Sequence, residues 1–462
     1  MASKKPSGPR CAAIVGPYLS GKTTLLESIL HLCGSTNRKG SVTDGNTVGD
    51  GSPEARARNM SVEINVASAE FLGEQWTFLD SPGSVELAQE MQSSLAVADA
   101  AIVVCEPGVD KVLGLTRLLL ELDSGNIPYI IFINKIDGTE AKVKETFDAI
   151  QALSERPLVL REIPTRADGK ITGYVDLVSE RAFAYKDGGP SDLVKIAESD
   201  TVRKNEERTV LMESLADFND ELMEQLLEDI VPATDEIYDN LTKELQDASI
   251  VPVFFGSAEL DHGIKRLMKA LRHETQDVSV TANRLGLDGG EAMSQVFKVY
   301  NGAQSGKLSL ARVWCGSIAD GTTLNGNRVS GIFKMVGQQQ EKISEAVAGQ
   351  VVALGRLDNI KVGDVLSPSG KAEGTVWPAA LKPVYGLAIK TNKREDEVKL
   401  AGALAKVIEE DLSLTYSPNP DTGELVIRGQ GETHLRIALD RLKNRNKLEV
   451  TAKLPLVAYK ES

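Results

Sequence analysis

Cysteine is scarce in this chain: 462 residues contain four, at Cys11, Cys33, Cys105 and Cys315, with no C-x-x-C pair. Their scatter argues against a disulfide framework and against a zinc knuckle. Apolar runs are short too, since none reaches the roughly 18 residues that a membrane span needs. The polar N-terminus has no signal-peptide core. We therefore expect a cytoplasmic, multidomain protein that makes no membrane contact.

Positive charge is also in deficit, because 52 Lys and Arg residues face 66 Asp and Glu residues. The excess gathers in residues 192–247, which hold seventeen acidic and five basic side chains. Such acidity argues against non-specific binding of nucleic acid. The acidic stretch is either a docking face for a protein or a solvated surface. A small basic excess in residues 430–462 leaves local contacts with RNA possible.

The first part of the chain alternates between apolar strand patterns and amphipathic helix patterns. We expect strands at 10–16, 62–69, 76–79, 100–105, 129–133 and 251–255, and helices at 22–32, 85–97, 111–122 and 263–272. This order predicts an α/β domain over residues 1–285, with a doubly wound, mostly parallel sheet. Residues 140–250 interrupt the alternation, so we expect an α+β insertion there. Its acidic helices are predicted at about 205–229 and 234–247.

Two further domains are predicted after the sheet. Short strands punctuated by glycine over residues 286–370 are typical of a small β-barrel. Residues 380–462 then follow the order strand, helix, two hairpin strands, helix, strand. This βαββαβ order predicts a ferredoxin-like α/β sandwich.

The segment Gly16-Pro-Tyr-Leu-Ser20-Gly21-Lys22-Thr23 matches the phosphate-binding pattern G-x4-G-K-(S/T). It follows a predicted strand and opens a predicted helix, which is the context the pattern requires. Backbone N–H groups of such a loop surround phosphate oxygens. We expect Lys22 to reach the β- and γ-phosphates and Thr23 to bind Mg²⁺. The residues expected at the phosphates are Gly16, Ser20, Gly21, Lys22, Thr23 and Thr24.

A second loop, Asp80-Ser-Pro-Gly83, ends the strand predicted at 76–79. Asp80 is expected to hold Mg²⁺ through water, and the Gly83 N–H to bond the γ-phosphate. The third motif, Asn134-Lys135-Ile-Asp137, follows another buried strand. The Asp137 carboxylate can accept two guanine N–H donors that adenine does not offer, which predicts GTP or GDP as the ligand. Ser257 and Ala258 are expected to bring a backbone N–H to guanine O6.

With these motifs in order, the chain resembles elongation factor G and its relatives among the ribosomal translation GTPases. Ser61 lies where the family has a Mg²⁺-binding threonine, in Arg58-Asn-Met-Ser61-Val62. Gly256–Gly263, Phe297–Leu308, Glu409–Asp411, Gly431–Leu435, Asp440–Lys443 and Pro455–Tyr459 resemble family segments further along. The resemblance implies a monomeric GTPase that acts on the ribosome. It also implies contacts with ribosomal RNA and, through the acidic insertion, with a stalk protein.

Three departures from the family pattern bear on activity. Ser84 stands where the family carries the histidine that positions the attacking water, and Leu19 removes a carboxylate from the phosphate loop. The resemblance also stops at Ser462, about where a fourth domain would begin. With Lys22, Gly83 and Ser84 as the catalytic set, we expect slow hydrolysis. Glu86 or Gln89 taking over the histidine's role is the alternative.

Other interpretations stay open at this point. The chain can be a GTP-dependent regulator or competitor of the elongation factor that hydrolyses little GTP. It can also be another translation GTPase, such as a relative of release or ribosomal-protection factors. A metabolic enzyme with a borrowed nucleotide domain has no catalytic constellation in its favour. We expect His434 to be a structural residue at a helix N-terminus.

Overall fold

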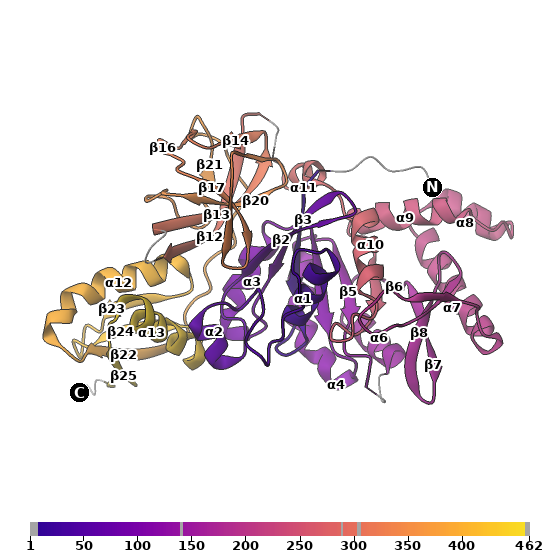
Figure 1. Cartoon of the computed structure of the whole chain (residues 1–462), viewed down its shortest axis with the longest axis horizontal. Helices are drawn as coiled ribbons and strands as arrows, with labels where there is room; N and C mark the ends of the chain where they lie inside the picture. Colours follow the sequence, from indigo (N-terminus) through magenta and orange to yellow (C-terminus); the bar gives the residue numbers. More distant parts are fainter. Residues whose placement is uncertain (1–7, 139–141, 288–289, 303–305, 458–462) are drawn as a thin grey trace, which may run out of the picture. The chain divides into compact units, whose positions relative to one another are not determined.

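The computed structural model describes residues 8–138, 142–287, 290–302 and 306–457. Figure 1 labels the helices and strands. The chain divides into two compact units, which we describe separately. The first comprises Met1–Thr47, Ala69–Asp80 and Ala98–Asp277; the second comprises Val48–Ser68, Ser81–Val97 and Val278–Ser462. The second unit thus includes two short segments of the α/β domain that the sequence predicts over residues 1–285. The predicted domain limits at 285, 286–370 and 380 stay predictions.

The first unit is built on a parallel sheet of buried strands. Their spatial order is β3 (Glu74–Asp80), β1 (Arg10–Val15), β4 (Ala100–Cys105), β5 (Tyr129–Ile133), β11 (Val251–Phe255) and β6 (Leu158–Leu160). Every pair of neighbours in this series runs parallel. Continuous apolar strands of this kind need helices on both faces. The predicted doubly wound sheet is confirmed.

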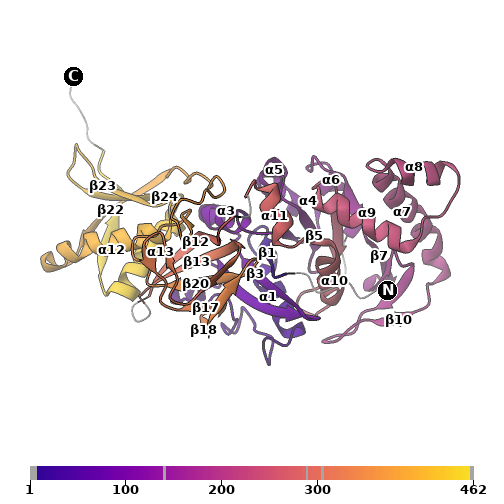
Figure 2. The same ribbon diagram turned by 90° about the horizontal axis from the view of Figure 1, so that it is seen from above.

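Helices cover the two faces of that sheet (Figure 2). On one face, α1 (Lys22–Leu32) packs with α10 (Ile264–Glu274). The other face carries α4 (Val109–Val112), α5 (Thr116–Ser124) and α6 (Val143–Gln151). The helix predicted at 111–122 is divided, because the 3₁₀ turn η2 (Leu113–Leu115) separates α4 from α5.

The insertion begins later than predicted. Helix α6 and strand β6 belong to the main sheet, since β6 pairs parallel with β11. The inserted antiparallel sheet starts only at β7 (Glu162–Ala167) and continues through β8 (Lys170–Asp176), β9 (Arg181–Ala184) and β10 (Asp192–Val194). The helix expected at 205–229 is also wrong in extent. It is two helices, α7 (Glu198–Ala216) and α8 (Asp220–Leu227), because the Asn219 side chain caps a new helix by accepting the Leu222 N–H at 3.1 Å. The third helix, α9 (Thr234–Gln246), lies where predicted.

The second unit contains a β-rich domain around one apolar core. Its antiparallel ladder runs β21 (Val365–Leu366), β12 (Met293–Gly302), β13 (Gly306–Cys315), β20 (Val351–Gly355), β17 (Ile332–Val336) and β18 (Gln339–Ile343). Two small pairs complete it, β14 (Ser317–Ala319) with β19 (Glu345–Val347) and β15 (Thr323–Leu324) with β16 (Asn327–Arg328). Val296, Val313, Ile332 and Leu354 are among the residues that share the buried core. The small β-barrel predicted from the sequence is thus observed as a β-rich, antiparallel domain.

The last part of this unit is the predicted βαββαβ sandwich. Its elements are β22 (Tyr385–Thr391), the 3₁₀ turn η3 (Arg394–Asp396), α12 (Glu397–Glu410), β23 (Thr415–Pro418), β24 (Leu425–Gly429), α13 (Glu432–Asn446) and β25 (Val450–Lys453). The sheet order β23-β24-β22-β25 is antiparallel throughout. Leu404 and Leu442 bring the two helices into its core. Ala458 and Tyr459, which belong to the family resemblance, lie outside the described residues.

Two segments from within residues 1–285 pack in the second unit. The first holds α2 (Pro53–Arg58) and the start of β2 (Asn65–Phe71); the second holds the 3₁₀ turn η1 (Val85–Leu87) and α3 (Ala88–Leu95). The short helix α11 (Val278–Arg284) belongs here too. The strand predicted from 62 starts only at Asn65, because Val62 is buried against Ala55, Leu87 and Ile437 instead of joining the sheet. Among the described residues, no helix is long and apolar enough to cross a membrane.

Candidate functional site

The loop between β1 and α1 requires glycine at two positions. Gly16 has φ 146°, and a Cβ there would lie 2.1 Å from the Val104 carbonyl oxygen. Gly21 has φ 92°, and a Cβ there would lie 2.3 Å from Asn134 Nδ2. Such backbone angles and close approaches exclude a side chain. The loop can therefore pass close to its neighbours and lead into the N-terminus of α1, where anions bind favourably.

Two polar side chains of the loop between β1 and α1, those of Lys22 and Ser20, are buried. The Lys22 ammonium donates to the Pro17 carbonyl oxygen at 2.8 Å, which fixes its aliphatic stem along the loop. Ser20 is 2% exposed, and its hydroxyl has no hydrogen-bond partner among the residues described. Thr24 is half-buried in the first turn of α1. A buried hydroxyl beside a helix N-terminus and an ammonium suits phosphate oxygens.

Thr23 and Asp80 meet at the predicted metal position. The Thr23 hydroxyl donates to Asp80 Oδ2 at 2.8 Å, and Asp80 is fully buried at the end of β3. The two come together because β3 pairs parallel with β1, with Asp80 opposite Ile14. Hydroxyl and carboxylate oxygens are the donors that Mg²⁺ prefers, so the residues present fit this ion.

Asn134 links three of the predicted motifs. Its side-chain Nδ2 donates to the Ser20 carbonyl oxygen at 2.9 Å, and its Oδ1 accepts the Ala258 N–H at 2.8 Å. Lys135 adds a second link, since its ammonium donates to the Leu19 carbonyl oxygen at 2.8 Å and pairs with Glu106. The structure thus brings the phosphate loop, the Asn134–Asp137 turn and the Ser257–Ala258 segment together. Asp137 itself is exposed to solvent.

The role expected of Ser257 and Ala258 at guanine O6 stays a prediction. The Ser257 N–H donates to the His262 carbonyl oxygen at 3.1 Å, and the Ala258 N–H is directed at Asn134. Both amides thus have hydrogen-bond partners within the chain. What this segment does in the structure is hold the Asn134 side chain in place.

Ser61, Gly83 and Ser84 lie in the second unit. The Ser61 hydroxyl donates to Asp50 Oδ2 at 3.1 Å, and the Asn65 amide donates to the other oxygen of that carboxylate at 2.8 Å. Gly83 and Ser84 precede η1 and are partly exposed. Their roles at Mg²⁺ and the γ-phosphate stay predictions.

The alternative that Glu86 or Gln89 replaces the missing histidine is not supported. The Glu86 carboxylate accepts the His434 N–H at 2.8 Å, at the N-terminus of α13. Gln89 Oε1 accepts the Leu381 N–H at 2.8 Å. Both acceptor groups are thus committed to the last domain, because helix N–H groups and loop amides there need partners.

A buried ionic network in the second unit escaped the sequence analysis. Glu90 of α3 accepts the Ile64 N–H at 3.1 Å and pairs with the buried Lys298 of β12. Glu63 pairs with Arg441 of α13 at 2.9 Å. Burial opposes ionisation of Glu63, but Arg441 and Lys298 together hold its pKa below the ordinary value. Buried charges need such partners, and these partners are distant in sequence.

His434 is structural, as expected from the sequence. It is 2% exposed; its Nδ1 accepts the Gln430 N–H at 3.1 Å, and its Nε2 lies 2.8 Å from Asp411 Oδ2. Since Nδ1 accepts, Nε2 carries the proton and donates to the carboxylate. Burial opposes the charge on Asp411, but the His434 hydrogen bond keeps the pKa of Asp411 well below its ordinary value.

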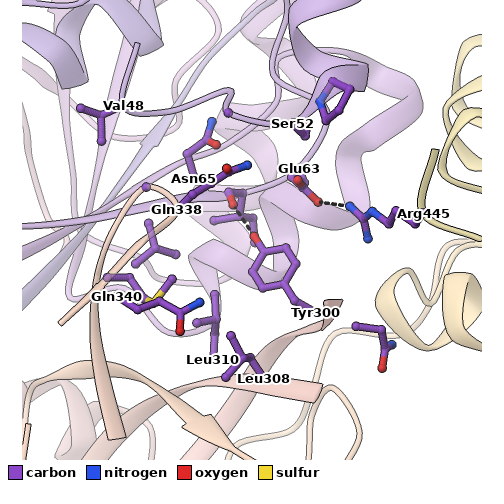
Figure 3. A pocket seen from close by; sticks show the side chains of 17 residues that line it. Val48, Ser52, Glu63, Asn65, Tyr300, Leu308, Leu310, Gln338, Gln340 and Arg445 are labelled. Carbon is purple, nitrogen blue, oxygen red and sulfur yellow. Dashed lines mark hydrogen bonds and ion pairs between the residues drawn. The ribbon is translucent and has the colours of Figure 1, made fainter. Parts of the chain in front are cut away.

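A cavity of about 380 Å³ opens in the second unit between the 48–66 segment and the β-rich domain (Figure 3). The Tyr300 hydroxyl donates to the Ile64 carbonyl oxygen at 2.8 Å, and Glu63 lies 3.9 Å from Arg445 beside it. Leu308 and Leu310 line its apolar side. None of the residues predicted to bind nucleotide lines this cavity.

Lys39 and Ser28 are contacts that sequence reasoning missed in the first unit. The Ser28 hydroxyl and the Lys39 ammonium both donate to the Ala258 carbonyl oxygen. The only sequence signal was a lone basic pair, Arg38-Lys39, within a loop of small polar residues. Nothing in that pattern indicates a contact with Ala258.

A strand-to-helix phosphate loop, a buried aspartate at a strand end and an Asn-Lys-x-Asp turn on a doubly wound sheet define the P-loop GTPase class. Three family models match the chain in order: the elongation factor Tu GTP binding domain at residues 9–277, elongation factor G domain 2 at 291–369 and elongation factor G domain III at 381–454. The chain belongs to the elongation factor G family of translation GTPases.

Individual relatives agree with this assignment. An elongation factor G-like protein of Synechocystis sp. is 44% identical over 98% of this chain and 68% of its own length. Elongation factor G 2 of Streptomyces coelicolor is 31% identical over 96% of this chain and 67% of its own length. A crystal structure of a Thermus thermophilus protein superposes with a TM-score of 0.89 at 26% identity, over 97% of this chain and 68% of that one.

Proposed function

We propose that this protein binds GTP and GDP with Mg²⁺ and works on the ribosome as an elongation factor G-type GTPase whose intrinsic hydrolysis is slow. The observation that carries the proposal is the position of Asn134, bonded to both Ser20 and Ala258. One side chain thereby joins the loop suited to phosphates to the segment suited to the base.

In this proposal the phosphates lie in the loop from Gly16 to Thr24. Lys22 neutralises β- and γ-phosphate charge, and the N–H groups opening α1 donate to phosphate oxygens. Thr23 and Asp80 are the residues of the first unit that would hold Mg²⁺. A role of Ser61 as a further ligand stays a prediction. The ion would supply charge neutralisation between the two terminal phosphates.

Base selection falls to Asp137, whose exposed carboxylate is available for the two N–H donors of guanine. Asn134 and Lys135 fix the backbone from which Asp137 projects. A site built to hydrogen-bond a particular base edge rejects other bases by roughly 10⁴.

Slow hydrolysis follows from Ser84. Phosphoryl transfer relies on positioning of water and on charge stabilisation. The Gly83 N–H and Lys22 would stabilise charge, but the Ser84 side chain is too short to reach where an imidazole would. Loss of one positioning group costs on the order of 10²–10⁴ in rate. Glu86 and Gln89 Oε1 each accept a hydrogen bond from the last domain, which disfavours them as substitutes for the histidine.

The test is single-turnover cleavage of GTP with and without ribosomes, on the wild type, Ser84→His and Ser84→Ala. We expect slow cleavage by the wild type and Ser84→Ala, and cleavage on ribosomes at least about tenfold faster in Ser84→His. Fast cleavage by the wild type would contradict the weak-hydrolysis proposal, while absent GTP binding would contradict the whole function.

A second candidate rests on the same serine: a GTP-dependent regulator or competitor that hydrolyses no GTP. Under this alternative the chain would bind ribosomes with GTP, turn over none, and slow the elongation factor in a competition assay. Turnover that ribosomes stimulate, however weakly, excludes it.

The ribosomal partners we propose follow the charge distribution. Helices α7, α8 and α9 present an acidic surface with exposed apolar side chains such as Val202, Met223 and Leu227. This mixture suits a basic protein, for which the family suggests a stalk protein. Exposed Arg436 and Lys443 on α13 offer a separate contact for ribosomal RNA.

A further inference from the structure

Both backbone polar groups of Ala258 are hydrogen-bonded to side chains. Its N–H donates to Asn134 Oδ1 at 2.8 Å. Its carbonyl oxygen accepts from two donors, the Ser28 hydroxyl of α1 and the Lys39 ammonium. Ala258 is 1% exposed, so these contacts are shielded from water. The contacts on the carbonyl side are therefore separated from Asn134 by the backbone of a single residue.

Lys39 contributes most of the contacts on that side. Besides the Ala258 carbonyl, its ammonium donates to the Glu259 carbonyl oxygen at 2.7 Å and to Asp261 Oδ1 at 2.8 Å. All three protons of the ammonium thus have acceptors in one four-residue stretch. The side chain is 18% exposed, and that of Asp261 is 22% exposed, so the ion pair is only partly screened. Charged hydrogen bonds of this kind are the strong ones.

The stretch held by Lys39 turns sharply and is held on its other side as well. Asp261 has φ 62°, in the left-handed region that non-glycine residues disfavour. The His262 ring stacks on Tyr185 with centroids 4.6 Å apart and interacts with Asp187 at 2.8 Å. The turn is thus kept in a strained conformation by contacts from two directions, of which Lys39 makes the one nearest Asn134.

We propose that Lys39 is a positioning residue for guanine recognition: it holds the Ala258–Asp261 segment in place and thereby orients Asn134 and the turn that carries Asp137. This inference rests on the proposed binding of GTP and GDP. Lys39 contacts no nucleotide itself. Because it acts on the base side, its loss weakens GDP and GTP equally.

The chain offers a matched control for the test. Arg38 is the exposed neighbour of Lys39, so Arg38→Met removes the same charge without touching the Ala258–Asp261 segment. Lys39→Met keeps most of the length of the side chain and removes its donors. Lys39→Arg keeps the charge and several donors, and Asp261→Asn removes only the ion pair.

The experiment measures dissociation constants of GDP, GTP and inosine diphosphate for the full chain and each variant, with thermal unfolding to check folding. We expect Lys39→Met to weaken GDP and GTP by the same factor, about tenfold or more, and to narrow the preference for GDP over inosine diphosphate. Arg38→Met should match the wild type, and Lys39→Arg should recover most of the affinity. If Lys39→Met does not fold, Asp261→Asn tests the proposal in its place. We expect Asp261→Asn to lose affinity for GDP and GTP by the same factor, but by less than tenfold.

Two results would overturn the inference. One is wild-type affinity for GDP in folded Lys39→Met; the other is a loss in Arg38→Met as large as that in Lys39→Met. Failure of the proposed function looks different, because the wild type would then bind GDP no better than ADP.

Discussion

Two non-glycine residues of the candidate site, Leu19 and Lys135, have left-handed backbone angles, with φ 64° and 60°. Each such residue costs roughly 1–2 kcal/mol, which contacts in its surroundings must offset. The two are bonded to each other, since the Lys135 ammonium donates to the Leu19 carbonyl oxygen. Strain of this kind persists where contacts over-determine the backbone, which is common at functional sites.

The first prediction concerns Asp137. We expect Asp137→Asn to weaken GTP binding by about 100-fold or more and to improve binding of xanthosine triphosphate, because the amide can donate where the carboxylate accepted. Competition binding of GTP, xanthosine triphosphate and ATP measures both effects. Asp110→Asn, an exposed change in the same unit, is the control for lost charge. Unchanged GTP affinity in Asp137→Asn would refute the role given to Asp137.

At the residue scale, the sequence predicts the motif residues and misses what holds them. Gly16, Lys22 and Asn134 stand in local patterns whose chemistry is known, so they are found without a structure. Lys39, Lys298 and Glu90 are ordinary charged residues in sequence, and their importance comes from partners more than 200 positions away. No local pattern encodes such a pairing.

At the scale of elements, Glu162 of β7 lies between the inserted sheet and the main sheet. It is fully buried, and its Oε1 accepts the Phe255 N–H of β11 at 3.1 Å. Burial raises the pKa of Glu162 to about 7, although Arg266 and the Phe255 amide favour its charged form. The carboxyl is therefore protonated in the folded chain over a pH range where it is ionised in the unfolded chain.

Because the pKa of Glu162 is higher in the folded chain than in the unfolded chain, this residue makes the folding stability fall as pH rises. An unfolded glutamate has a pKa of about 4.3, so the folded chain binds the extra proton between about pH 4 and pH 7. The stabilisation that protonated Glu162 contributes is complete below about pH 4. It is lost as pH rises from there through about 7. Glu162→Gln removes this titration, so the wild type should lose about 3 kcal/mol relative to the variant between pH 5 and pH 8. Urea unfolding at both values measures the difference. Exposed Glu145→Gln is the control, and a constant difference between wild type and Glu162→Gln would contradict the assignment.

Predicted elements agree best with the structure where an apolar run is both continuous and bounded. Helix α1 and strands β4, β5 and β11 have the predicted limits, because glycine or polar residues end each run. The sequence places strand β6 in the insertion, because three apolar residues after Pro157 do not reveal that they pair with β11, more than 90 positions later. The break at Asn219 was missed because a capping side chain interrupts a helix pattern without a proline or glycine.

At the scale of the whole molecule, the charges separate between the units. The acidic helices α7, α8 and α9 belong to the first unit, and the basic excess of residues 430–462 belongs to the second. A chain with net charge −14 is repelled by RNA over most of its surface, so association with a ribosome depends on where its charges lie. Proteins of the ribosome and its RNA would then contact different units.

The last prediction tests the acidic surface. Glu221 and Glu224 on α8 and Glu228 at its end are exposed, so changing all three to lysine alters the surface potential without disturbing a buried contact. We expect association with ribosomes to slow by about tenfold at low salt, because steering between opposite charges raises association rates. The effect should shrink as salt approaches about 0.5 M, where the Debye length falls to about 4 Å. Stopped-flow light scattering on GTP-loaded protein measures the rate. As a control, the exposed Glu341 and Glu345 of the β-rich domain and the exposed Glu373 just after it are changed to lysine together, which gives the same change in net charge elsewhere. Equal slowing in both triple variants would show that only net charge matters, and no slowing in either would leave the α8 surface merely solvated.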